Sequence, residues 1–181
     1  MWLVTLDASR VRPEVRPRLT LLQNEEATRA GILRALDALV DSTASGDIVV
    51  LFYAGHGSQM RDREGTKPTG MDETLVAHDS GRAPNENRDI TDDEIRLRLS
   101  RLAKKTRYTT LIFDCCHSAT LHRDAFGEAE RSLAADTRDI TELPPSPLAA
   151  FERGALDAEP AKGGHGSTFL PPSDRFTVLA A

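Results

Sequence analysis

IVVLFYAGHG (residues 48–57) and TTLIFDCCH (residues 109–117) are the two stretches that decide the fold. The first begins as an unbroken apolar run with β-branched and aromatic residues, and the second begins with a similar run, TTLIF; both predict a strand buried on both faces, as in parallel sheets. Each run then turns at once into glycine or polar residues. Because the carboxyl ends of parallel strands meet at one edge of a sheet, we expect His56 and Cys116 to face each other across a crevice.

Helical patterns lie between and around these strands. Apolar residues recur at helical spacing from Ala27 to Val40, and Thr91-Asp92-Asp93-Glu94 has the form of a capping box that opens a second helix. Short strands are predicted at Arg18–Leu22 and Thr74–Ala77. The alternation of strand and helix predicts an α/β domain with a mostly parallel sheet flanked by helices.

Length and charge limit the classes of protein that need to be considered. The chain has 181 residues, enough for one domain over 1–181, and a net charge of −5 with scattered Lys and Arg, which makes nucleic acid an unexpected partner. No apolar run reaches the roughly 20 residues of a membrane span, and no signal peptide is evident, so we expect a cytoplasmic protein with no membrane partner. The two cysteines are neighbours and cannot form a disulfide framework.

The C-terminal third has a different character. Residues 126–172 are rich in Pro, Gly and charges with little periodicity, and are predicted to be a long flexible loop. Residues 176–180 form one last strand-like run, so the core is expected at about 18–125 plus 176–180.

A cysteine and a histidine brought together by the fold can perform acyl transfer. An imidazole that takes the thiol proton activates the sulfur as a nucleophile, and the imidazolium later protonates the leaving amine. His56, held between Gly55 and Gly57, and the Cys115-Cys116 pair offer these groups.

Four ordered motifs resemble those of metacaspases, within the caspase-like cysteine peptidases of family C14. They are YAGHGSQ (53–59), DETLV (72–76), DDEI (92–95) and DCCHS (114–118). The resemblance implies a caspase-like three-layer fold with His56 and Cys116 as the catalytic pair, an oxyanion site near Gly57 and protein or peptide substrates. It also implies that Asp114 lines the first substrate pocket and selects Arg or Lys by charge.

The resemblance further implies a calcium site, because several metacaspases bind calcium through carboxylates. The candidates are Asp79, Asp92, Asp93 and Asp124, and no other cofactor is expected. The basic residues of the long loop, Arg131, Arg138, Arg153 and Lys162, are candidate self-cleavage points. The family pattern has further elements before Leu19 and after Ala181, so we expect a fold truncated at both ends, with an unpaired sheet edge open to association.

Simpler interpretations stay open beside these. Asp92 and Asp93 also suit the first turn of a helix, where carboxylates favour the helix dipole, and Asp114 could cap a turn. Cys115 is expected to be a packing residue. The alternative to a peptidase is a catalytically silent caspase-like interaction or regulatory module. A zinc site from His56, Cys115, Cys116 and His117 fits less well, since adjacent cysteines lack the usual ligand spacing.

Overall fold

The structure is a computed structural model that describes residues 18–63, 65, 67–115, 133–139 and 176–180. Its elements, in chain order, are a 3-10 turn η2 (Asn24–Glu26), α1 (Arg29–Ser42), β1 (Ile48–Ala54), β2 (Gly57–Arg61), β3 (Met71–Leu75), β4 (Ile90–Thr91), α2 (Asp92–Lys105), β5 (Tyr108–Asp114) and β6 (Phe176–Ala180). None of the described helices has the length and apolar character that a bilayer-spanning helix requires.

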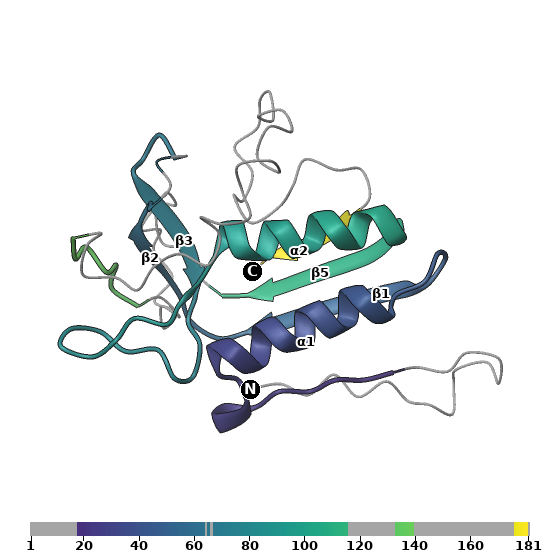
Figure 1. Ribbon diagram of the computed structural model, residues 1–181, viewed down its shortest axis with the longest axis horizontal. Helices are drawn as coiled ribbons and strands as arrows, with labels where there is room; N and C mark the ends of the chain where they lie inside the picture. The colour runs from purple at the N-terminus through teal and green to yellow at the C-terminus, as the bar shows by residue number, and fades with distance from the viewer. Residues whose placement is uncertain (1–17, 64, 66, 116–132, 140–175, 181) are drawn as a thin grey trace, which may run out of the picture.

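The main sheet has the strand order β1-β5-β6, and both pairings are parallel. The two apolar runs of the sequence, β1 and β5, therefore lie side by side (Figure 1). A second, antiparallel sheet of β2, β3 and β4 continues from the end of β1. The expected α/β class, the parallel sheet and the final strand at residues 176–180 are confirmed.

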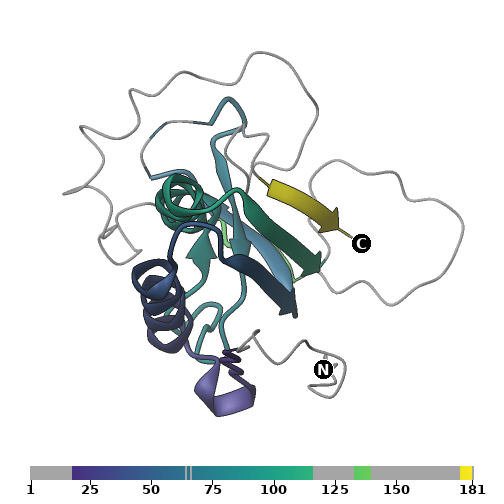
Figure 2. The same ribbon diagram turned by 90° about the vertical axis from the view of Figure 1, so that its right-hand side faces the viewer.

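Both helices cover the same face of the main sheet (Figure 2). Alternate side chains of the strands, such as Val49, Leu111 and Phe113, pack with the buried faces of α1 and α2 in one core cluster. On the other face Ile48 is 80% exposed and Val50 is 59% exposed. The described residues thus supply one helical layer of the expected three-layer fold.

Both helices begin at a threonine cap. The Thr28 side chain accepts a hydrogen bond from the Gly31 amide at the start of α1. Thr91 and Glu94 form the capping box expected from the sequence, which satisfies amides that the first turn of α2 would otherwise leave unpaired. This cap places Asp92 and Asp93 in the first turn of α2, directly after β4.

One expected strand is absent, and another has different bounds. Residues 18–22 form no strand, and Leu19 is 70% exposed, because these residues have no strand partner within the described part of the chain. The strand expected at 74–77 lies earlier, at 71–75, where it pairs with β2, for which no strand was predicted. Most of the loop 126–172 lies outside the described residues, but Leu133 and Asp136 of the described segment 133–139 bond to the backbone of β2.

Candidate active site and acidic cluster

Residues 55–57, which we call the histidine turn, are hydrogen-bonded directly to the end of β5. Ala54 is the register partner of Asp114, and the amide of Gly55 donates a hydrogen bond of 3.3 Å to the carbonyl of Asp114. His56 therefore follows two residues after one member of a paired position, and Cys116 follows two residues after the other. The side chain of His56 is exposed to solvent.

The Tyr53 side chain stabilises the histidine turn through its hydroxyl group. Its hydroxyl group lies 2.9 Å from the carbonyl oxygen of His56 and 3.1 Å from that of Val76, so its proton can serve either acceptor. A Cβ at Gly55 would lie 2.6 Å from the Tyr53 hydroxyl oxygen, which explains why glycine is needed there. Burial, the largest cause, raises the pKa of Tyr53 well above its usual range, so the hydroxyl stays a donor.

The backbone of Gly57 points away from β3. Gly57 pairs with Leu75, and the Val76 amide donates to the carbonyl of His56, so Gly57 and Leu75 form a non-hydrogen-bonded pair. The N–H and C=O of Gly57 thus face the outer edge of β2, where the carbonyl accepts the amide of Leu133.

On the cysteine side, the structure describes the chain as far as Cys115. Cys115 is 2% exposed and belongs to the hydrophobic core, in agreement with the packing role expected for it. Asp114 is half-buried at the end of β5. Cys116 and His117 lie outside the described residues, and the same holds for Asp124.

A cluster of three buried carboxylates lies between the second sheet and α2. Asp72 of β3 and Asp92 and Asp93 of α2 are each at most 2% exposed. They are neighbours because β3 pairs with β4, which matches Thr74 with Thr91, and Asp72 lies on the same side of β3 as Thr74. We call Asp72, Asp92 and Asp93 the acidic cluster.

The acidic cluster carries more negative charge than its surroundings compensate. Burial above all, and then the charges of Asp92 and Asp93, raise the pKa of Asp72 to about 8. Burial also raises the pKa of Asp92 to about 6, although Lys67 acts in the opposite direction. Such shifts indicate carboxylates that are buried and, in the case of Asp72, held close to other carboxylates.

Two cations contact the cluster, and several of its oxygens have no hydrogen-bond donor among the described residues. The Lys67 ammonium bonds to Asp92 and lies 3.4 Å from Asp93 Oδ1, which also accepts a hydrogen bond of 2.5 Å from Arg96. The oxygens that lack such a donor are both of Asp72, Oδ1 of Asp92 and Oδ2 of Asp93. Unpaired buried carboxylate oxygens are the donor set that Ca²⁺ prefers.

The described residues do not form a ready-made metal centre. Among them, no three Asp, Glu, His or Cys side chains converge as metal ligands in this conformation. This includes His56 and Cys115 of the suggested zinc site. The ammonium group of Lys67 lies between Asp92 and Asp93.

Asp79 has different partners from the other carboxylates expected at the calcium site. It accepts a hydrogen bond of 2.7 Å from the Arg29 amide at the start of α1 and pairs with Arg88. Asp72 is the residue that joins Asp92 and Asp93 instead. The sequence does hold a signal for it: Asp72 and Thr74 alternate in a strand-like segment, but their proximity to Thr91 depends on strand pairing.

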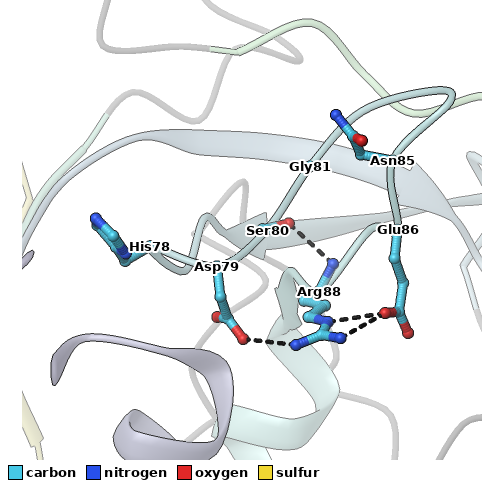
Figure 3. Close-up of a pocket in the computed structure, with 7 residues that line it drawn as sticks. All are labelled: His78, Asp79, Ser80, Gly81, Asn85, Glu86 and Arg88. Atoms are coloured by element: carbon cyan, nitrogen blue, oxygen red, sulfur yellow. Dashed lines mark hydrogen bonds and ion pairs between the residues drawn. The ribbon is translucent and has the colours of Figure 1, made fainter. Parts of the chain in front are cut away.

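Asp79 also lines an open polar pocket on the loop between β3 and β4 (Figure 3). Arg88 lies at its centre, between Asp79 at 3.1 Å and Glu86 at 2.7 Å, and the Arg88 amide donates to Ser80. The guanidinium charge is therefore already matched by two carboxylates. None of the three residues of the acidic cluster lines this pocket.

Comparison with known proteins defines the class to which this α/β domain belongs. The family described as metacaspase, peptidase C14 domain, matches residues 14–123. This match covers both strand ends, the histidine turn and the acidic cluster. The chain belongs to the metacaspase family.

Two curated relatives agree with this assignment. Metacaspase-4 of Arabidopsis thaliana is 35% identical over 121 residues, which are 65% of this chain and 27% of that protein. Metacaspase-2 of Trypanosoma brucei brucei is 34% identical over 100 residues, which are 55% of this chain and 27% of that protein. A crystal structure of a Geobacter sulfurreducens protein has 30% sequence identity and a TM-score of 0.44, covering 56% of this chain and 35% of that one. The chain thus spans about a quarter of the length of these two curated relatives.

Proposed function

We propose that this protein is a cysteine endopeptidase in which Cys116 is the nucleophile and His56 is its proton acceptor. The observation that supports this most directly is the pairing of Ala54 with Asp114, reinforced by the hydrogen bond from Gly55 to Asp114. His56 and Cys116 each lie two residues beyond this paired position in the sequence. Membership of the metacaspase family supports the same chemistry.

The proposed reaction has two halves. The Cys116 thiol passes its proton to His56, the sulfur attacks the peptide carbonyl carbon, and the imidazolium protonates the departing amine. Water then attacks the thioester, which releases the new carboxyl end and restores the thiol. The outward-facing N–H of Gly57 is a suitable donor to the oxygen that becomes negatively charged during each attack.

We further propose that cleavage follows Arg or Lys, because Asp114 lies two residues before the nucleophile and is half-buried. A carboxylate at that position attracts a cationic side chain by a charge-assisted hydrogen bond. Self-cleavage in the segment after Cys116 is part of the same proposal. Arg138 is a candidate position, although it is bonded to Asp136 and would first have to leave it.

Calcium is the cofactor that we propose for the acidic cluster, with Asp72, Asp92 and Asp93 as its holders. The donorless oxygens of the cluster and the raised pKa of Asp72 support this set over one that contains Asp79. Bound calcium would supply the positive charge that this buried region lacks, and so stabilise the second sheet and the start of α2.

The decisive experiment compares Cys116→Ala with its neighbour Cys115→Ala. Fluorogenic peptides ending in Arg, Lys or Asp are hydrolysed with calcium or with a chelator present. We expect cleavage after Arg and Lys that is lost in Cys116→Ala and kept in Cys115→Ala. Activity that survives in Cys116→Ala would refute the nucleophile, and cleavage only after Asp would refute the specificity.

The silent-module alternative makes its own prediction. If no peptide is cleaved, alkylation by iodoacetamide across a pH series measures the pKa of Cys116, with Cys116→Ala to identify its signal. A pKa near that of a free thiol, about 8.5, favours the silent module, whereas reaction at a clearly lower pH supports an activated thiolate.

A further inference from the structure

The loop that joins β2 to β3 is built around one carboxylate. Asp62 accepts a hydrogen bond of 2.8 Å from the Gly65 amide and one of 2.5 Å from the Lys67 amide, and its own amide donates to the carbonyl of Gly70. These bonds fix the backbone of Lys67 in place. The position of the Lys67 side chain is therefore a feature of the folded loop.

The ammonium group of Lys67 contacts the acidic cluster. Lys67 is 12% exposed, although lysine is seldom buried unless it is paired, and it bonds to Asp92 with Asp93 close by. The bond to Asp92 and the nearby carboxylate of Asp93 favour the charged form of this ammonium group. It serves as a resident counter-ion.

One ammonium group nevertheless compensates the cluster only in part. It carries a single charge and three N–H donors, and both oxygens of Asp72 remain without a donor among the described residues. Arg96 reaches Asp93 from the more exposed side. A divalent cation would bring twice the charge and could bind the oxygens that Lys67 does not reach.

We propose that Lys67 is a built-in competitor of the divalent cation at the acidic cluster. This inference rests on the proposed calcium site and concerns its regulation. The ammonium and the metal ion bind the same two carboxylates, Asp92 and Asp93, and two cations held that close repel each other, so the two states exclude each other. Calcium binding then includes the release of Lys67, which lowers the affinity for calcium and couples binding to the Asp62–Gly70 loop.

The test is direct calcium binding, measured by isothermal titration calorimetry on wild type, Lys67→Met and Lys104→Met. Met keeps most of the length of the lysine side chain and removes its charge. Lys104 is exposed in the last turn of α2, so its variant has the same change in net charge away from the cluster. We expect Lys67→Met to bind calcium at least tenfold more tightly than wild type, and Lys104→Met to differ by less than twofold.

A second measurement covers the case in which Lys67→Met is unstable without metal. The midpoint of thermal unfolding is recorded over a series of free calcium concentrations, and a tighter site raises that midpoint at lower calcium. Equal or weaker affinity in Lys67→Met overturns the competitor while the calcium site stands. No heat and no shift in any of the three proteins overturns the calcium site and the competitor together.

Discussion

Replacing Asp72 by Asn tests whether the acidic cluster is short of positive charge. Asn keeps the shape of the side chain and removes the charge. The pKa of Asp72 is raised from 3.8 to about 8 in the folded protein. Each pKa unit corresponds to about 1.4 kcal/mol. At pH 7 the unfolded wild type gains free energy by ionising Asp72, whereas the folded protein keeps the proton. Wild type therefore loses up to about 4 kcal/mol of stability that the variant does not lose.

The sign of the pH dependence follows from that shift. The folded carboxyl group binds its proton more tightly than the unfolded one, so wild-type stability falls as pH rises from about 4 towards about 8. Without calcium, we expect Asp72→Asn to be more stable than wild type by about 2 to 4 kcal/mol near pH 7.5 and by under about 2 kcal/mol near pH 5. Local relaxation reduces the upper figure.

The assay is urea unfolding followed by circular dichroism, at both pH values, in chelator and in calcium. Asp41→Asn is the matched control, because Asp41 is an exposed carboxylate on α1, and its change should stay within about 0.5 kcal/mol. In calcium the order should reverse, since the variant lacks one of the proposed calcium ligands. The reasoning is refuted if Asp72→Asn is less stable than wild type in chelator, or if its gain does not change with pH.

Three further changes test the packing that supports the site. Gly55→Ala forces a Cβ against the Tyr53 hydroxyl, so we expect a loss of about 1 to 3 kcal/mol in urea unfolding and at least tenfold lower peptidase activity; unchanged activity would contradict the role given to this turn. Arg29→Met removes the cation from the buried carboxylate of Glu94 and should cost about 3 to 5 kcal/mol, most of which the additional change Glu94→Gln restores. Leu99→Ala empties a fully buried position between α2 and the sheet and should cost about 2 to 5 kcal/mol by the same measurement.

The sequence predicted the main sheet and the second helix well because their signals are local. A run such as residues 48–53 is apolar throughout and rich in β-branched and aromatic residues, and it forms most of strand β1. The capping box of Thr91 and Glu94 needs only four consecutive residues. The segment 18–22 was predicted wrongly because an isolated apolar stretch becomes a strand only when a partner strand binds it.

The places of His56 and Asp114 in the fold were predicted by the same local reasoning. His56 lies two residues after the end of β1 and Asp114 is the last residue of β5, as expected from two strand-like runs that each end in polar or glycine residues. The catalytic roles of His56 and Cys116 stay predictions, as do the roles of Asp114 and Asp124. The contribution of Tyr53 to the histidine turn was not predicted, because its hydroxyl acts through the backbone of residues that a pattern of types does not place.

The acidic cluster could not be predicted from residue patterns alone. The helix-dipole interpretation of Asp92 and Asp93 is correct as far as it goes, since both lie in the first turn of α2. Only the register of β3 against β4 brings Asp72 to them, and only the loop built on Asp62 brings Lys67. Hydrophobic and capping preferences act between near neighbours in the chain, whereas Coulomb interactions depend on distance in space, and that distance exists only once the chain has folded.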